Sequence, residues 1–506
     1  MGRYTVLICV LCELIVLLQA GNLMFMVFGG APPTLIGCRN RNDTGWLHPH
    51  HLCDLYHQGT CDPIVEYQFL SVNVEFAQLC GEGKRIKDST SYQMIGYMVG
   101  ALVFGQVSDT FGRKWPMLVC VAMTGVLGWV SSFAGSLHMF TLWRTLLSFF
   151  NTGHIVIVMV YMCEKFPRHH RMWLNFVFSW SPNLMFASII AYYSQDWRTF
   201  SRALNTLAFV ATVLLWFCEE SIYWLVRKGR VEEAEKAMKR IHRINGDELD
   251  DKALQLVLQN EKRNYEETKS TGHYFFHHLF CTWRLLGYSL TMILSYFAVS
   301  IINYGIMFNM EHLEGSIFFN TIFIGAFRYL LNVISAAADY NFPAVGRKTA
   351  HMFFSGYTVI AIAIAVAIET FEWTSLNSLT RYLVMSAGSM VAQIYVVNGV
   401  TCSEIYPTAV RNIAYATTQI SGSIGSILGP QLFHLSAIFA LLPYIVMLSL
   451  QVGETCCITV FVPESKGRPM ADAMPEPYER FSLCQPKVDG SDAAPRKVAP
   501  TDEERV

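Results

Sequence analysis

The sequence predicts an all-α polytopic membrane protein made of two related halves, and three observations support this prediction. Of the 506 residues, 52% are hydrophobic and 15% are charged, whereas soluble domains carry about 25% charged residues. Apolar runs of about 20 residues, the length that crosses a bilayer, recur along the chain. The phrase Gly-Arg-Lys at residues 112–114 returns at residues 346–348, and internal duplication of this kind is typical of membrane transporters.

Twelve apolar ranges are expected to be transmembrane helices, arranged as two pseudo-symmetric six-helix bundles. The first range contains Glu13 and is longer than the ~7–15 residues of a signal-peptide core, so we expect it to be retained as a helix. The ranges are 5–28, 91–108, 115–134, 139–162, 172–193, 201–218, 284–307, 316–338, 350–369, 380–402, 412–434 and 439–462.

The predicted helices divide the chain into six parts. The linker between the bundles contains the pattern of an amphipathic helix from Val231 to Ile244, which should lie on the membrane surface and contact lipid. The tail is poor in apolar residues and is predicted to be partly disordered. The parts are 1–30 (first helix), 31–90 (external loop), 91–218 (rest of the N-terminal bundle), 219–283 (linker), 284–462 (C-terminal bundle) and 463–506 (tail).

Lys and Arg residues in the short loops indicate the orientation of the helices, because cytoplasmic loops are enriched in these residues. Arg113, Arg227 and Arg347 fall in loops that share one side of the predicted membrane. That side is expected to be the cytoplasm, and both termini are expected on it. The chain is therefore predicted to be a multi-pass protein of the plasma membrane.

The loop at 31–90 is consequently expected outside the cell. It holds the sequon Asn42-Asp43-Thr44, which predicts glycosylation at Asn42. Cysteines in such an oxidising compartment commonly form disulfides, so two are expected here, in any of three pairings. The four cysteines are Cys38, Cys53, Cys61 and Cys80.

Several classes of function find no support in the sequence. A net charge of −1 gives no electrostatic reason to bind nucleic acid. The chain has no Gly-Lys-Ser phosphate loop for ATP hydrolysis, and no nucleophile and base at compatible spacing for an enzyme. We expect no cofactor and no metal, since the histidines near residue 50 lack a recognised ligand spacing. The oligomeric state stays open.

Phrases spread over almost the full length resemble the major facilitator superfamily and, within it, the organic cation, organic anion and carnitine carriers of solute carrier family 22. One departure is Ile222-Tyr223, which replaces the Pro-Arg usual after the sixth helix. The phrases are Gly105–Asp109 with Gly112–Lys114, Arg144 with Glu164, Glu220–Leu225, Asn303–Gly305, Glu404–Thr408 with Arg411, and Pro463–Gly467.

The resemblance implies secondary transport of a small organic ion or zwitterion by alternating access. A coupling ion or a counter-substrate would supply the driving force. The alternative is a non-transporting receptor or scaffold that keeps the fold, which the altered Ile222-Tyr223 leaves open. Asp109 and Arg113 favour a transporter, because a scaffold needs no two-state gate.

The resemblance also implies a gate on the cytoplasmic side, built once in each half. The alternative is that its basic residues only anchor the loops at the membrane surface. Further charges at the ends of the fourth and tenth helices are expected to form ion-pair networks beside it. The predicted gating residues are Asp109, Gly112, Arg113, Glu164 and Arg168 in the first half, and Asp339, Gly346, Arg347, Glu404 and Arg411 in the second.

Arg328 lies near the middle of the predicted eighth helix, where a charge costs at least ~2.5–3.5 kcal/mol. It should therefore face a cavity, where it could bind an anion, or pair with an interior acid such as Glu13. Ser423 occupies a position where cation carriers of the family tend to have an acid and anion carriers an arginine, so it indicates neither charge. The predicted substrate-binding residues are Asn22, Trp180, Tyr304, Arg328, Gln419 and Ser423.

Overall fold

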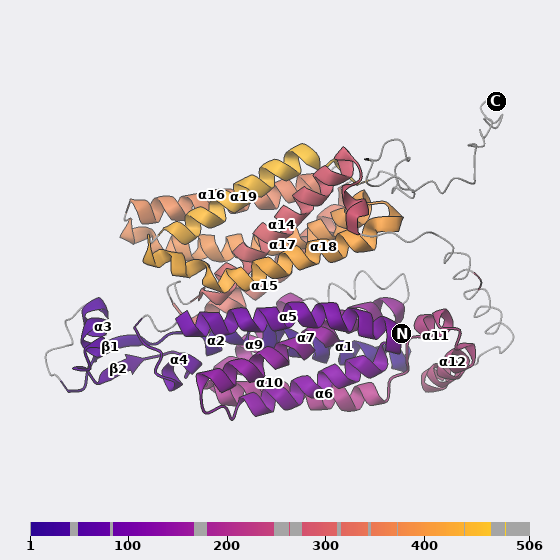
Figure 1. Ribbon diagram of the computed structural model, residues 1–506, viewed down its shortest axis with the longest axis horizontal. Helices are drawn as coiled ribbons and strands as arrows, with labels where there is room; N and C mark the ends of the chain where they lie inside the picture. Colours follow the sequence, from indigo (N-terminus) through magenta and orange to yellow (C-terminus); the bar gives the residue numbers. More distant parts are fainter. Residues whose placement is uncertain are drawn as a thin grey trace.

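A computed structural model shows two helical bundles packed side by side, with the N-terminal bundle in purple and the C-terminal bundle in orange and yellow (Figure 1). One end of the N-terminal bundle carries a small domain of strands and short helices, here called the loop end. The opposite end carries α11 and α12 and is called the linker end. The described residues are 2–40, 49–80, 84–165, 180–246, 263, 276–310, 315–342, 346–371, 373–439, 441–466 and 481.

Each predicted transmembrane range contains a helix of the structure. In the N-terminal bundle the helices are α1 (Arg3–Leu23), α2 (Phe25–Gly29), α5 (Lys84–Phe111), α6 (Lys114–Ser131), α7 (Leu137–Lys165), α9 (Trp180–Ser194) and α10 (Trp197–Trp216). In the C-terminal bundle they are α14 (Trp283–Phe308), α15 (Ile317–Asn341), α16 (Arg347–Thr370), α17 (Asn377–Ile405), α18 (Thr408–Leu428) and α19 (Leu442–Phe461), with the 3-10 segment η5 (Gly429–Ala437) after α18.

Nine spans in the described part of the chain are long and apolar enough to cross a membrane. The helices α5, α9 and α18 are not among them. The sequence of α18 explains this, because Thr, Ser, Gln and Gly residues recur along it. A helix that faces a polar cavity between bundles is less apolar than one that faces lipid. The predicted all-α polytopic fold is confirmed.

Two differences from the predicted helix boundaries have a clear cause. The first helix is broken at Met24, so that α1 and α2 are separate. The helix α5 begins at Lys84 rather than at residue 91, because its first two turns are polar and carry no hydropathy signal. Lys87 in this segment donates a hydrogen bond of 2.6 Å to the backbone carbonyl of Phe308, at the end of α14.

The loop between α2 and α5 folds as a small domain of its own. It contains the antiparallel strands β1 (Thr34–Cys38) and β2 (Pro63–Glu66) and the short helices α3 (Pro49–His57) and α4 (Val72–Glu75). Its core is little more than Leu35, Leu52 and Leu79, and a core of this size needs covalent support.

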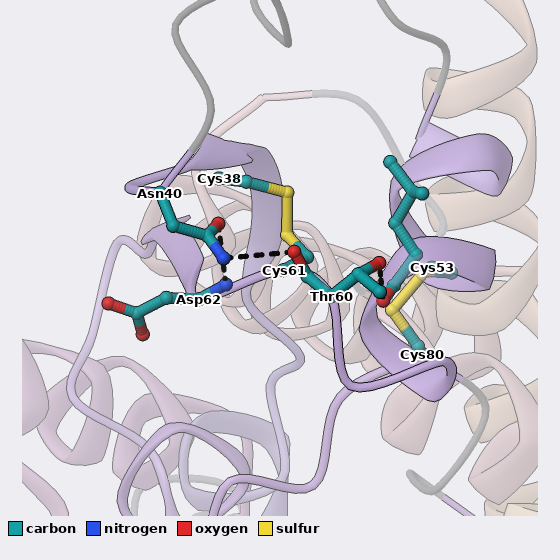
Figure 2. The surroundings of a disulfide bond; sticks show 8 residues. Cys38, Asn40, Cys53, Thr60, Cys61, Asp62 and Cys80 are labelled. Atoms are coloured by element: carbon teal, nitrogen blue, oxygen red, sulfur yellow. Dashed lines mark hydrogen bonds between the residues drawn. A yellow bond between two sulfur atoms is a disulfide. The ribbon is translucent and has the colours of Figure 1, made fainter.

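Two disulfides supply that support (Figure 2). One joins Cys38 to Cys61 and the other joins Cys53 to Cys80. The two predicted disulfides are therefore confirmed, and one of the three possible pairings is selected. The strand pair was not predicted, and Asn42 lies outside the described residues.

The linker begins with α11 (Ile222–Arg227) and α12 (Val231–Asn245). The amphipathic helix predicted from Val231 to Ile244 is present as α12. Its small residues Ala234 and Ala237 are buried in one cluster with Trp224 of α11. The two helices cover the linker end of the N-terminal bundle (Figure 1).

Replacing Cys53 and Cys80 together by serine should destabilise the loop domain by about 3 kcal/mol, because the disulfide closes a long loop. Limited proteolysis of the purified protein would measure this as faster cleavage within the loop. The variant Cys456→Ser, which changes an exposed free cysteine, is the control. A non-reducing peptide map that joined Cys53 to Cys38 or to Cys61 would contradict the pairing.

Candidate functional site

A cavity of about 350 Å³ lies between the two bundles. Its lining residues are mostly uncharged, and they combine aromatic rings with amide and hydroxyl groups from both bundles. The N-terminal bundle supplies Tyr97 from α5 and Trp180 and Ser181 from α9. The C-terminal bundle supplies Asn303, Tyr304, Arg328, Asn332, Ala392, Gln393, Tyr395, Val396, Gln419, Gly422, Ser423 and Ser426 from α14, α15, α17 and α18.

The structure brings five of the six predicted substrate-binding residues to this cavity. They come from four helices that are distant in sequence. Their contact with a substrate stays a prediction, but their position around one cavity agrees with it. They are Trp180, Tyr304, Arg328, Gln419 and Ser423.

Asn22, the sixth residue, does not line the cavity. It is buried inside the N-terminal bundle, where its side-chain oxygen and its backbone oxygen accept hydrogen bonds of 3.0 and 2.8 Å from Arg144. Its amide nitrogen donates to Asn205 at 2.9 Å. These bonds occupy the polar atoms of Asn22 in this conformation, and its role in substrate binding stays a prediction.

Arg144 was expected in an ion-pair network, and its contacts are different. Besides its hydrogen bonds to Asn22, the guanidinium of Arg144 lies over the face of the Phe25 ring. Its central carbon is 4.0 Å from the centre of that ring. Carbonyl oxygens and a π face therefore stabilise this fully buried cation. The sequence could not show this, because Asn22 and Arg144 meet only through the packing of α1 against α7.

Among the described residues that line the cavity, Arg328 is the only charged one, and it is 5% exposed. Its guanidinium donates to the side-chain oxygen of Asn303 and to the backbone carbonyl of Gly388. The alternative pairing with Glu13 is not observed. In the described ranges no carboxylate forms an ion pair with Arg328, so the cavity carries an uncompensated positive charge.

Asn332 is a cavity residue that the sequence reasoning missed. It accepts a hydrogen bond of 2.8 Å from Gln393, and its own amide donates across the bundle interface to Ser181 at 3.4 Å. The spacing between Asn332 and Arg328 in the sequence could have predicted this cavity residue. Asn332 is four residues after Arg328, so the two lie on the same face of α15.

The linker end holds two matching charge networks, one in each bundle. In the first, Arg113 donates to Asp109 at 2.7 Å and to Glu164 at 3.3 Å. Burial by itself would lower the pKa of Arg113, but the two carboxylates raise this pKa above its ordinary value. In the second, Arg347 donates to Asp339 at 2.7 Å and to Glu404 at 3.4 Å.

Glu164 and Glu404 thus form ion pairs as predicted, but with the loop arginines Arg113 and Arg347 rather than with Arg144 or Arg381. Each ion pair joins residues of the same bundle. Arg411 is not part of these networks, since it donates to the backbone carbonyl of Tyr406 at 3.3 Å. Arg168 lies outside the described residues. Whether the networks act as a gate stays a prediction.

Each network includes a carboxylate that was not predicted as a site residue. Glu220, before α11, accepts hydrogen bonds from the backbone N–H groups of Arg113 and Lys114, at the start of α6. Glu464, after α19, accepts in the same way from Arg347 and Lys348, at the start of α16. A carboxylate at a helix N-terminus satisfies free N–H groups and the helix dipole.

The two glycines of the repeated phrase leave room for these carboxylates. A Cβ atom at Gly112 would lie 2.5 Å from Glu220, and one at Gly346 would overlap Glu464. Gly112 also has a φ of +104°, which other residues rarely adopt. The repeated Gly-Arg-Lys therefore forms a capped turn. The glycine leaves space for a carboxylate from a distant segment, and this carboxylate caps the helix that begins at the turn.

Hydrogen bonds between the bundles lie at the loop end or around the cavity, as far as the structure describes the chain. Gln431 of η5 donates to Asp88 of α5 at 2.9 Å. Gln68 of the loop domain donates to the carbonyl of Gly315 at 3.1 Å and accepts from Ile317 at 3.0 Å. The ring of Phe318 stacks on Phe28. The bundles are therefore closed against each other at the loop end.

Two bundles of one topology, with a polar cavity between them and a repeated charge network, define a membrane transporter of the alternating-access type. The Sugar (and other) transporter family matches residues 67–475. The chain belongs to this family, and it is a secondary transporter rather than an enzyme.

Curated relatives agree with the resemblance to solute carrier family 22. "Solute carrier family 22 member 21" of Mus musculus is 26% identical over 82% of this chain and 73% of its own length. "Organic cation/carnitine transporter 2" of Rattus norvegicus is 27% identical, over 80% and 72%. "Solute carrier family 22 member 7" of Rattus norvegicus is 24% identical, over 83% and 76%.

Solved structures show the same fold. The inward open conformation of the xylose transporter XylE from E. coli superposes with a TM-score of 0.65 at 15% identity, covering 91% of this chain and 97% of that one. The proton:xylose symporter XylE bound to 6-bromo-6-deoxy-D-glucose gives a TM-score of 0.62 at 17% identity, over 92% and 98%. At these identities the likeness concerns the fold alone.

Gly112→Ala and Gly346→Ala should each lower the stability of the protein by about 1–3 kcal/mol, because the added methyl group displaces the capping carboxylate. Thermal unfolding of the purified variants would measure the loss. Gly105→Ala, in the same phrase but with no atom within 4 Å of the added Cβ, is the matched control. Equal unfolding temperatures for Gly105→Ala and Gly112→Ala would refute the capped turn.

Glu464 should make the stability depend on pH. Burial alone would raise its pKa, but the backbone N–H donors of Lys466 and Arg347 hold the pKa below its ordinary value of 4.5. The ionised cap therefore stabilises the fold fully above pH 4.5 and loses this effect as the pH falls through the lower folded value. In Glu464→Gln the unfolding temperature should fall less between pH 5 and pH 3 than in wild type. Parallel curves would contradict this assignment.

Proposed function

We propose that this transporter carries small organic anions, including zwitterions that present a carboxylate, across the plasma membrane. The observation that carries the proposal is Arg328, a buried guanidinium that faces the cavity and has no carboxylate partner in the part of the chain that the structure describes. Among the described residues, the hydrogen-bond acceptors of its guanidinium are the neutral oxygens of Asn303 and Gly388.

The physical argument is one of charge balance. An arginine in the membrane interior costs at least ~2.5–3.5 kcal/mol, and neutral hydrogen-bond acceptors offset only part of this cost. The Nε atom of Arg328 is buried and has no acceptor. A guanidinium can match a planar carboxylate in two-point geometry. The Nε atom is one donor that has no acceptor, so a carboxylate substrate would complete the site.

The neutral part of the wall suits the rest of such a substrate. Trp180, Tyr304 and Tyr395 provide ring faces, and Gln419 and Ser423 provide hydrogen bonds. Ring faces attract an ammonium group through cation–π contacts. A zwitterion would therefore find a partner for each charge. The relatives named as organic cation/carnitine transporters include this chemistry, since carnitine bears both a quaternary ammonium and a carboxylate.

The orientation that we propose places the loop domain outside the cell and the linker end in the cytoplasm, with both termini. The disulfides of the loop and the positive residues of the linker end support it. In this orientation the contacts at the loop end make the conformation inward-facing. The networks of Arg113 and Arg347 would then bias the exchange between the two states.

Arg328→Gln should raise the KM for labelled carnitine and benzoate at least about tenfold, because it leaves the substrate carboxylate without its partner. Uptake into cells of low background, normalised to surface protein, is the measurement. The variant Arg328→Lys keeps the charge but loses the two-point geometry, so its KM should lie between those of wild type and Arg328→Gln. Arg381→Gln is the control, because Arg381 contacts Asn320 and does not line the cavity.

Two outcomes would overturn the proposal. If Arg328→Gln kept normal carboxylate uptake, Arg328 would not be the residue that binds the substrate carboxylate. If surface-delivered wild type showed saturable uptake of tetraethylammonium but none of carnitine or benzoate, the proposed substrate class would be wrong.

A further inference from the structure

Gln19 of α1 connects two cavity residues although it does not line the cavity itself. Its side-chain amide is buried, with 1% of the residue exposed. The amide nitrogen donates to the hydroxyl of Tyr97 at 3.3 Å, and the amide oxygen accepts from the indole N–H of Trp180. Tyr97 and Trp180 both belong to the cavity wall.

The two aromatic residues lie on the helices that form the interface with the other bundle. Tyr97 is on α5, which packs against α18, and Trp180 is on α9, which packs against α15. Gln19 therefore links the two interface helices of the N-terminal bundle through one side chain. Its backbone is also held, because Asn151 donates to the carbonyl of Gln19 at 3.3 Å.

An amide is suited to this position for a chemical reason. The indole N–H can only donate, so it needs an acceptor, and a buried donor without one costs about 1–3 kcal/mol. The Tyr97 hydroxyl takes the donor of the same amide. These bonds hold the indole of Trp180 in one orientation and fix the position of the hydroxyl end of Tyr97. The positions of the two rings determine the shape of the apolar wall.

We propose that Gln19 is a positioning residue that sets the aromatic wall of the cavity and thereby selects substrates by the size of their apolar part. The proposal rests on transport through this cavity, but it does not depend on the charge of the substrate. Arg328 on the C-terminal bundle binds the charged group of the substrate. Gln19, acting through Tyr97 and Trp180, determines which apolar groups fit.

The test compares two substrates of equal charge and different shape. In Gln19→Leu the ratio of the KM for benzoate to the KM for butyrate should change about three- to tenfold, the range expected when a ring contact is lost. The maximal rate per surface molecule should stay near that of wild type. A purely structural defect would lower surface protein or the maximal rate and would leave the ratio unchanged.

Gln93→Leu is the matched control. Gln93 is another buried glutamine of the N-terminal bundle, 2% exposed, and it contacts Ser89 at 3.4 Å rather than a cavity residue. The control should leave the ratio at the wild-type value. If Gln19→Leu and Gln93→Leu gave the same ratio, the positioning role would be refuted.

A second comparison tests whether Gln19 acts through the two rings. In the Tyr97→Phe/Trp180→Phe background both hydrogen-bonding groups are gone, so Gln19→Leu should change the ratio no further. An equal change in this background and in wild type would overturn the inference.

Failure of this inference can be told apart from failure of the proposed function. If wild type takes up quaternary ammonium ions instead of carboxylates, the proposed anion selectivity fails. The same ratio is then measured with tetramethylammonium and tetraethylammonium, and it decides the role of Gln19. If wild type takes up none of the four probes, both proposals fall.

Discussion

The membrane interior offers no water to polar groups, and this constraint governs the structure. Inside the N-terminal bundle Arg144 takes its partners from Asn22 and lies over Phe25. In the C-terminal bundle Glu454 is fully buried, lies 2.7 Å from His351 and accepts from Ser295. Such contacts hold the helices of one bundle together without a hydrophobic driving force between them. Each bundle can then move as one body.

The same rule makes the exceptions informative. Arg328 has only neutral partners among the described residues, and it faces the space between the bundles. The side-chain amide of Gln19 forms hydrogen bonds with two residues of the cavity wall, Tyr97 and Trp180. The proposed charge recognition and the proposed shape recognition thus lie on different bundles. A substrate that touches both walls would favour states in which the walls are close together, which is how binding energy biases alternating access.

Duplication is clearest at the linker end. Each half has a glycine, an arginine with two carboxylates and a capping glutamate from a distant segment. The loop end has no such symmetry, since the disulfide domain is inserted into the first half only. Hydrogen bonds of Gln68 in this domain with Gly315 and Ile317 join the first half to the second at the closed loop end.

The sequence by itself determined the membrane fold, the twelve helical ranges and the repeated charged loop. Bilayer thickness dictates the length of apolar runs, and Asp109 and Asp339 come shortly before Arg113 and Arg347 in the sequence. The other acids of the networks are distant in sequence and reach the arginines only through the packing of the helices. Only the tertiary structure decided the disulfide pairing, the partner of Arg328 and the different positions of Asn22 and Gln19. The two residues are less than one turn apart on α1, and the helices packed around α1 determine which of them reaches the cavity wall.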